Sequence, residues 1–222
     1  MDIEFEITED GSHTFFVPGL NEHYHSTHGA IQESMHVFID AGLRRCEKRE
    51  VKVLEIGFGT GLNAFLALQE AEKRSVKIDF TTLDLYPVST ADAEKLNYAE
   101  LINPSQKDIF KELHKADWER WNQITLWFSL LKMQFDFSNP SEFHPENKFD
   151  IVFFDAFAPE KQPGMWTQPI FDKIYSVSSE NAILTTYCAK GTVRRMLQAA
   201  GFFVERLPGP PGKREILRAV KK

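Results

Sequence analysis

The sequence predicts an α/β fold with a seven-stranded, mostly parallel sheet, a C-terminal antiparallel hairpin and a small N-terminal β-appendage. Short apolar runs alternate with helical patterns along the chain, which is typical of strand–helix–strand units. The turn at residues 208–212, Pro-Gly-Pro-Pro-Gly, is too short for a crossover helix, so the last strand must return antiparallel. The expected strands cover residues 51–56, 77–83, 128–135, 150–154, 182–186, 202–207 and 215–220.

The N-terminal residues carry a different pattern. Residues 3–17 alternate apolar and polar side chains around Asp10-Gly11, which indicates a hairpin. An amphipathic helix is expected at residues 31–46, which places the boundary between the appendage, residues 1–30, and the main domain, residues 31–222. Further helices are expected at residues 64–73, 86–103, 110–121, 170–177 and 191–200.

Four histidines, His23, His25, His28 and His36, crowd the start of this first helix and suggest a metal site. Their spacing lacks a carboxylate motif such as H-E-x-x-H, however. Contacts within a polar loop or with a substrate are therefore preferred, and no metal is predicted.

A glycine-rich turn follows the first main strand. Gly57, Gly59 and Gly61 can adopt positive φ angles and carry no Cβ, so they let a flat ligand approach the backbone. The dinucleotide fingerprint G-x-G-x-x-G requires glycine or alanine at position 62, which is leucine here. The remaining pattern, E-x-G-x-G-x-G, resembles the first motif of class I S-adenosylmethionine (SAM) methyltransferases, in which the acid, here Glu55, contacts the methionine ammonium. An ordinary glycine-rich turn is the alternative.

Three acids end the next strands of the sheet. Asp84 can accept hydrogen bonds from both ribose hydroxyls, and the alternative for it is a helix N-cap. Asp136 can receive an adenine amino group or simply cap a surface turn. Asp155 lies just past the carboxyl end of a fully apolar strand, where α/β sheets bind ligands.

Composition limits the remaining possibilities. The chain has 222 residues, 42% of them hydrophobic, and a net charge of −6, which argues against a protein that coats nucleic acid but allows a local basic patch. Cys46 and Cys188 are too few for a disulfide framework or a zinc site. Because there is no long apolar run and no signal-like start, a soluble cytoplasmic protein without membrane contact is expected.

Four motifs together resemble the methyltransferase domain of the MnmC family. They are G-F-G-T-G-L-N at residues 57–63, D-A-F-A-P-x-K-x-P-x-M-W-T at 155–167, T-V-R-R-x-L-Q-x-A-G-F at 192–202 and G-K-R-E at 212–215. The resemblance covers about residues 20–220. It implies a class I SAM-methyltransferase (Rossmann-like) fold and a SAM-dependent enzyme that makes 5-methylaminomethyl-2-thiouridine at the tRNA wobble position.

The resemblance also implies which residues form the site. The SAM site would contain Glu55, Gly57, Phe58, Gly59, Gly61, Asn63, Asp84 and Asp136, with Tyr24 and Glu33 in the segment that folds over the cofactor. The target nucleoside would be surrounded by Asp155, Phe157, Pro159, Lys161 and Trp166.

The chain departs from the family in two respects. Phe135 precedes Asp136, where the family usually has glycine. The chain is also only methyltransferase-sized, with no room for the flavin oxidase that some members carry. A separate enzyme is therefore expected to supply the aminomethyl group.

Asp155 is expected to act as the catalytic group by accepting a hydrogen bond and a proton from the amine. Phe157 and Trp166 would stack on an extruded base, or else belong to a rigid loop that faces the core. Basic residues of the loop at 155–167 and the C-terminal third would face tRNA phosphates, although each alone can equally be a solvated charge. These residues are Lys161, Lys190, Arg194, Arg195, Lys213, Arg214, Arg218, Lys221 and Lys222. Methylation of a small-molecule or protein amine, and a non-catalytic SAM-binding module, remain as alternatives.

Overall fold

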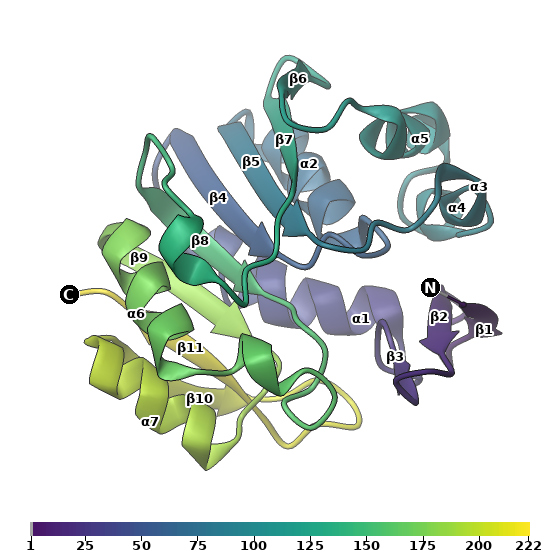
Figure 1. Cartoon of the computed structure of the whole chain (residues 1–222). Coiled ribbons are helices and arrows are strands. Elements are labelled where there is room, and N and C mark those ends of the chain that lie inside the picture. Colours follow the sequence, from purple (N-terminus) through teal and green to yellow (C-terminus); the bar gives the residue numbers. More distant parts are fainter. Residues whose placement is uncertain (1) are drawn as a thin grey trace.

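The computed structural model describes residues 2–222, and its centre is an eight-stranded sheet (Figure 1). The strand order is β10-β11-β9-β8-β4-β5-β7-β6. The strands are β4 (Glu50–Ile56), β5 (Lys77–Asp84), β6 (Trp121–Gln123), β7 (Phe128–Gln134), β8 (Phe149–Phe154), β9 (Ser178–Thr186), β10 (Phe203–Pro208) and β11 (Glu215–Val220). The predicted seven strands and the closing antiparallel hairpin are confirmed, and β6 is an additional edge strand.

The order of the strands places a ligand-binding edge in the sheet. From β4 the chain proceeds to β5 and β7 on one side, and it then crosses to β8 and β9 on the other side, with all five strands parallel. The carboxyl ends of β4 and β8 therefore flank a topological switch point. In open α/β sheets, ligands bind in the crevice outside such a point.

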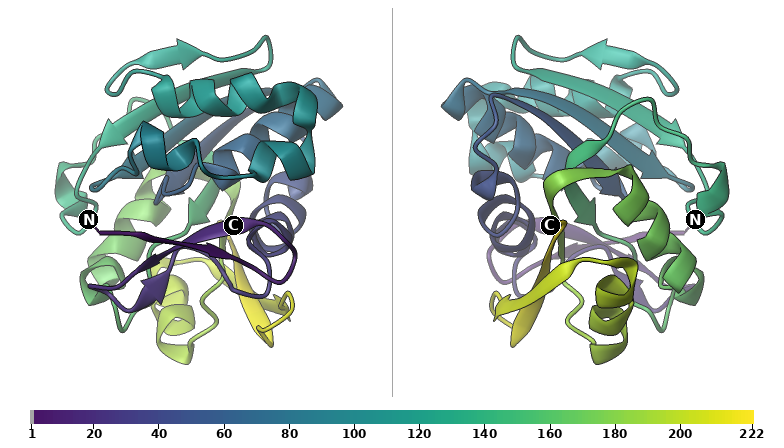
Figure 2. Two further views of the ribbon diagram at one scale, coloured as in Figure 1. Left: turned by 90° about the vertical axis from the view of Figure 1, so that its right-hand side faces the viewer. Right: turned by 90° about the vertical axis from the view of Figure 1, so that its left-hand side faces the viewer.

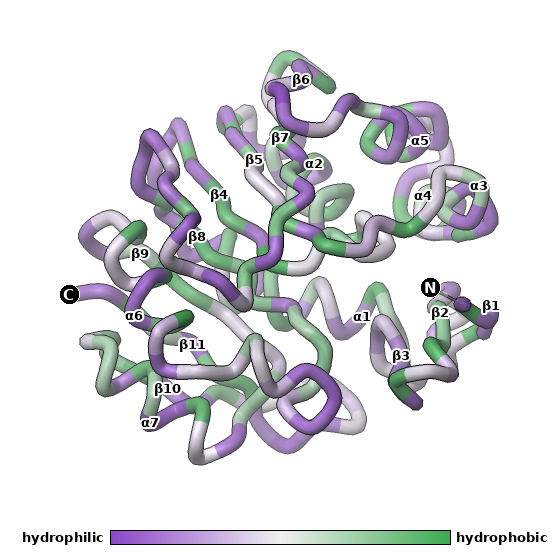
Figure 3. Tube along the Cα trace, viewed as in Figure 1, coloured by the Kyte–Doolittle hydropathy of each residue, from purple (hydrophilic) through white to green (hydrophobic). Residues whose placement is uncertain are grey.

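Alternation along the strands produces two hydrophobic layers. Val51 and Val53 of β4 face one layer, while Leu54 and Ile56 face the other. The first layer contains α2 (Leu62–Arg74), α4 (Tyr98–Ile102) and α5 (Lys107–Lys115); the second contains α6 (Gln168–Val177) and α7 (Gly191–Ala200). Hydrophobic stretches concentrate in the strands, and α5 turns a hydrophilic face outward (Figure 3).

The N-terminal residues form a separate three-stranded antiparallel sheet of β1 (Glu4–Ile7), β2 (His13–Val17) and β3 (Glu22–His23). This sheet lies on the side toward which the parallel strands point (Figures 1 and 2). Phe15 of β2 is buried in the first hydrophobic layer, and the backbone N–H of His13 donates to Asn97 Oδ1 at 2.9 Å. The β-appendage is thus packed onto the domain, while the proposed boundary at residue 30 stays a prediction.

The helix expected at residues 31–46 is helical without a gap only as far as Asp40. It divides into a short α1 (Ala30–Ser34), a π-helical turn η1 (Met35–Asp40) and a 3₁₀ turn η2 (Leu43–Arg45). Gly42 separates the last two, and a Cβ there would lie 2.6 Å from the carbonyl oxygen of Phe38. The close packing of this turn ends the helix.

The helix expected at residues 110–121 is also wrong at its C-terminal end. The helix α5 stops at Lys115, and Trp121 instead begins β6, which pairs antiparallel with β7. The Asn122 side chain donates to the Asp117 carbonyl and closes the intervening turn. Trp121, expected on the helix, is 52% exposed at the sheet edge. The predicted helical stretch at 86–103 is two short helices, α3 (Thr90–Ala93) and α4.

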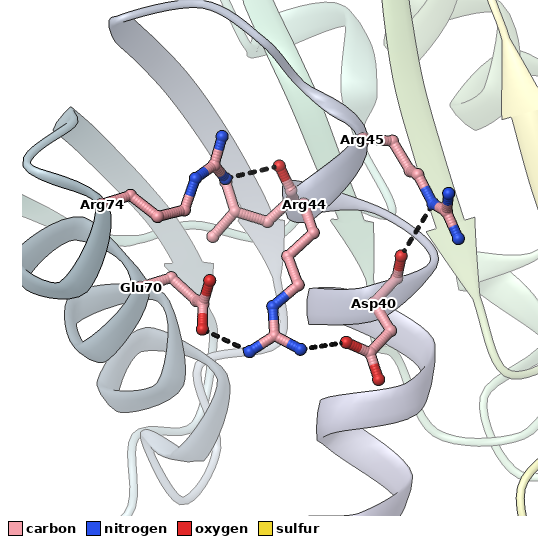
Figure 4. Close-up of polar contacts among 6 residues, drawn as sticks. Asp40, Arg44, Arg45, Glu70 and Arg74 are labelled. Carbon is pink, nitrogen blue, oxygen red and sulfur yellow. Dashed lines mark hydrogen bonds and ion pairs between the residues drawn. The ribbon is translucent and has the colours of Figure 1, made fainter.

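A polar cluster connects the interrupted first helix to α2 (Figure 4). The Arg44 guanidinium pairs with Asp40 of η1 and, at 2.5 Å, with Glu70 of α2. Arg74 donates to the carbonyl oxygen of Cys46 at 2.8 Å. Arg44 thus links η1 to α2, and Arg74 satisfies a backbone carbonyl oxygen just past the η2 turn. Over residues 2–222, no helix is long and apolar enough to cross a membrane.

Candidate active site

A cavity of about 570 Å³ opens at the carboxyl ends of the parallel strands, at the topological switch point. Its walls come from the glycine turn after β4, the ends of β5, β7 and β8, the segment around β3 and the β10–β11 hairpin. Ten of the residues predicted from the sequence line it: Tyr24, Glu33, Gly57, Phe58, Gly59, Asn63, Asp84, Asp136, Asp155 and Phe157.

The glycine turn adopts the backbone that its sequence predicts. Gly57, Gly59 and Gly61 have φ angles of 100°, 50° and 72°. A Cβ on Gly57 would lie 2.5 Å from the backbone oxygen of Asp155, so only glycine allows the β4 and β8 ends to approach this closely. The backbone N–H of Gly59 donates to Asp84 Oδ2 at 2.9 Å, which fixes the turn to the end of β5.

We expect Gly59→Val to weaken SAM binding at least about a hundredfold without unfolding the protein. A β-branched residue is strained at a φ of 50°, and its Cβ would lie 3.0 Å from the Tyr24 ring across the cavity. Isothermal titration with SAM measures the loss, and Gly19→Val, at an exposed glycine with open space around it, serves as the control. Unchanged affinity in Gly59→Val would contradict the assignment.

Two acids at the cavity suit the polar groups of a nucleoside. Asp84 accepts backbone N–H bonds from Gly59 on one oxygen and, at 2.8 Å, from Tyr86 on the other, and lone pairs on both remain free for ribose hydroxyls. Burial raises the pKa of Asp84 above its ordinary value. Asp136 follows β7 and accepts the Ser138 N–H at 3.0 Å. These positions fit the predicted ribose and adenine contacts, which stay predictions.

Asp155 follows β8 and lies in the cavity wall beside the glycine turn. Its backbone N–H donates to the Ile56 carbonyl at 3.0 Å, and its Oδ2 accepts from Asn63 Nδ2 at 2.8 Å. Burial, reinforced by the nearby Glu33 carboxylate, raises the pKa of Asp155 to about 7. The group can therefore exchange a proton near neutral pH.

Glu55 lies behind this wall and does not line the cavity. Glu55 is 0% exposed, and its carboxyl group accepts a hydrogen bond from Thr82 Oγ1 at 2.6 Å. Burial raises the pKa of Glu55 well above its ordinary value, so a proton on this carboxyl is favoured. The structure thus places Glu55 in the core beneath the cavity and does not bring it to the cavity wall.

The loop after β8 divides between the cavity and the core. Phe157 lines the cavity and packs edge-on against Tyr24, with ring centroids 5.1 Å apart. Trp166, predicted to contact the nucleoside, is 6% exposed in the second hydrophobic layer, and its indole N–H donates to the Phe157 carbonyl at 2.8 Å. It therefore supports the loop from behind.

Other predicted site residues lie outside the cavity wall. Gly61 is the N-cap residue of α2, and its N–H donates to the Phe58 carbonyl at 2.9 Å. Pro159 and Lys161 are partly buried in the loop after β8, and Arg194 and Arg195 lie on α7. Neither pair is among the residues that line the cavity.

Two of the polar cavity residues that sequence reasoning did not assign to the cavity are Tyr187 and Lys213. Tyr187, just after β9, donates its hydroxyl to the Ala156 carbonyl at 2.9 Å. Lys213, assigned above to a phosphate-facing surface, instead lines the cavity and pairs with Glu33 at 2.8 Å. The G-K-R-E motif includes this lysine, but its contact with Glu33 depends on how the β10–β11 hairpin folds back, which the motif does not indicate.

Three more of the predicted phosphate contacts have partners within the protein. Lys190 pairs with Glu160, and Arg218 pairs with Glu205 at 2.8 Å. The buried Lys221 ammonium donates to the Tyr175 carbonyl at 2.9 Å. The basic surface is therefore smaller than the sequence suggests.

The clustered histidines have separate partners. His23 contacts Glu6 and His28 contacts Glu9, each at 3.0 Å, while His25 bonds Thr60 Oγ1 at 2.7 Å. His36 donates to the Pro208 carbonyl at 2.8 Å. In the part of the chain that the structure describes, no three His, Cys, Asp or Glu side chains are grouped to hold a metal ion.

Comparisons with known proteins agree with this geometry. A family model described as S-adenosyl-L-methionine-dependent methyltransferase matches residues 97–222. The tRNA 5-methylaminomethyl-2-thiouridine biosynthesis bifunctional protein MnmC of Pseudomonas savastanoi pv. phaseolicola is 31% identical over 209 residues, covering 88% of this chain and 31% of that protein. MnmC of Vibrio campbellii is 29% identical, covering 87% of this chain and 32% of that protein. The resemblance to MnmC is confirmed, and the chain spans about a third of the length of the curated relatives it matches.

Two solved structures share the fold. MnmC2 from Aquifex aeolicus matches with a TM-score of 0.80 and 24% identity, over 98% of this chain and 70% of that chain. Spermidine synthase from Thermotoga maritima matches with a TM-score of 0.55 and 12% identity, over 100% of this chain and 80% of that chain. These likenesses confirm the predicted class I methyltransferase fold.

Proposed function

The chain belongs to the S-adenosyl-L-methionine-dependent methyltransferases whose family model it matches, and we propose that it methylates the amine of 5-aminomethyl-2-thiouridine at the tRNA wobble position. The product is 5-methylaminomethyl-2-thiouridine. The names of the MnmC relatives support this substrate. The aminomethyl group must be in place before methylation, so an earlier enzymatic step supplies it.

The observation that carries the proposal is Asp155, a carboxyl group that titrates near neutral pH in the wall of the cofactor cavity. A primary alkylamine is mostly protonated at neutral pH and cannot attack until it loses a proton. Asp155 accepts this proton, and its hydrogen bond from Asn63 keeps the carboxylate oriented. Phe157, held by Trp166 through its backbone carbonyl, offers a stacking surface for the extruded base.

SAM supplies a methyl group on a sulfonium, and an unprotonated amine takes that group by in-line displacement. The chain's own contribution is to position the amine and to remove its proton. The acids Glu33 and Asp84 make the cavity attractive to cations, which suits an amine substrate.

The proposal is tested by incubating the protein with labelled SAM and tRNA that carries 5-aminomethyl-2-thiouridine, followed by nucleoside mass analysis. Incorporation that yields the methylaminomethyl nucleoside supports the proposal. Methyl transfer to a free amine with none to tRNA would indicate the small-molecule alternative, and SAM binding without any transfer would indicate a non-catalytic module. Either result would overturn the tRNA assignment.

We expect Arg194→Glu with Arg195→Glu to raise the apparent KM for tRNA at least about tenfold and to leave SAM affinity unchanged. Both arginines lie on α7, which starts at the carboxyl edge of the sheet, and Lys190 just before it pairs with Glu160 of the loop after β8. Steady-state kinetics at low and moderate salt measure the effect.

Lys73→Glu with Lys77→Glu changes the same net charge at residues outside the cavity wall, so it serves as the control. An equal rise in KM in both double variants would show that net charge, and not this surface, determines tRNA binding.

A further inference from the structure

One basic side chain lies among the acids of the cavity. Of the described residues that line it, five are carboxylates, Glu22, Glu33, Asp84, Asp136 and Asp155, and Lys213 alone is a lysine or arginine. The cation comes from the hairpin between β10 and β11, far in sequence from the glycine turn.

The cofactor needs such a cation. SAM carries a sulfonium and an α-ammonium, which suit the acids, but also an α-carboxylate, which like charges would repel in a partly buried site. Backbone N–H groups of the glycine turn could bind this α-carboxylate only if they had no other acceptor. Those of Gly57 and Gly61 donate to the carbonyls of Leu83 and Phe58, each at 2.9 Å, and that of Gly59 donates to Asp84.

The position of Lys213 is well defined. Its ammonium lies 2.8 Å from Glu33 Oε1 and 5.0 Å from the centre of the Tyr187 ring. Glu33 is fixed in turn, because its Oε2 accepts the Ser26 N–H at 2.8 Å. The pair therefore joins the C-terminal hairpin to the segment after β3.

Lys213 and the two acids Asp84 and Asp136 reach the cavity from opposite sides of β4. In the sheet, β5, which ends at Asp84, and β7, which ends two residues before Asp136, lie on one side of β4, whereas the β10–β11 hairpin that carries Lys213 lies on the other side, beyond β8 and β9. With Asp84 and Asp136 at the nucleoside end, the amino-acid end of the cofactor falls near Glu33 and Lys213.

We propose that Lys213 binds the α-carboxylate of SAM and that Glu33 binds its α-ammonium, so that one ion pair of the protein recognises the zwitterionic end of the cofactor. Before binding, Lys213 and Glu33 neutralise each other, and after binding each side chain faces an opposite charge of SAM. The proposal goes beyond the tRNA substrate, since it requires only the cofactor.

The test compares SAM with decarboxylated SAM, which keeps both positive charges and lacks the carboxylate. In Lys213→Met, the dissociation constant for SAM should rise about tenfold to a hundredfold, because a charged hydrogen-bond partner is lost. The constant for decarboxylated SAM should change less than about threefold. S-adenosylhomocysteine, which retains the carboxylate without the sulfonium, should weaken in parallel with SAM.

Titration calorimetry without tRNA measures all three ligands, so the outcome is independent of the proposed substrate. Lys213→Arg should restore much of the preference for SAM, and Lys73→Met, on the exposed end of α2, should change nothing. If the binding of SAM and of decarboxylated SAM is weakened equally, Lys213 maintains the shape of the cavity and does not bind the carboxylate. An unchanged SAM affinity in Lys213→Met would show that Lys213 does not contact SAM. Either result overturns the proposal.

Discussion

Asp155→Asn is expected to lower kcat by about a hundredfold or more while changing SAM affinity little. Asparagine keeps the size of the side chain and can still accept the hydrogen bond from Asn63, but it cannot take a proton from the amine. Single-turnover methylation at saturating SAM, with calorimetry for the cofactor, separates the two effects. Equal losses in turnover and SAM binding would place Asp155 among the cofactor contacts.

The pH profile gives a second, independent reading of the same variant. Because the pKa of Asp155 is raised to about 7, its active carboxylate form is present above this pH and is lost as the pH falls through it. In the wild-type protein, kcat/KM should therefore rise with pH and level off above about 7. The substrate amine loses its proton only at a higher pH, so its titration affects a separate part of the pH profile. The limb near 7 should be absent in Asp155→Asn, and its persistence would assign the titration to another group.

The sequence predicted the sheet because its evidence is local and periodic. The apolar runs, the glycine turn and the short hairpin loop each fix one strand or connection, and β4, β5, β7, β8, β9, β10 and β11 all appear. What it missed depends on contacts between distant segments. Trp121 joins β7 as an edge strand, although its neighbours have helical spacing. The break at Gly42 reflects close packing against the Phe38 carbonyl.

The same distinction holds in the cavity. Acids at strand ends could be located from the sequence, because parallel strands present their carboxyl ends at one edge. The orientations of three side chains could not be predicted from the sequence. Trp166 lies two residues before a helix that packs on the core and is drawn inward, and Glu55 alternates onto the buried face of β4. Lys213 meets Glu33 only because the hairpin folds over the N-terminal segment.

The cavity should also reject a substrate that differs by one anion. We expect methylation of tRNA bearing 5-aminomethyl-2-thiouridine and almost none of tRNA bearing the 5-carboxymethylaminomethyl form. The second nucleoside has a secondary amine and places a carboxylate next to the reacting nitrogen, and thus close to Asp155 and Glu33. Above pH 7 the ionised Asp155 would repel this added anion.

Two like charges about 4 Å apart near a protein surface repel by about 4 kcal/mol, which corresponds to a loss of roughly a thousandfold in kcat/KM. The two purified tRNAs are incubated separately with the protein and SAM at pH 8, digested and analysed by mass spectrometry, with unmodified tRNA as the background control. At this pH Asp155 is ionised, so a weak reaction with the carboxymethylaminomethyl form cannot be attributed to a neutral Asp155. Comparable methylation of both substrates would show that the acids of the cavity do not contact the reacting amine. Methylation of the anionic form alone would reverse the proposed charge preference.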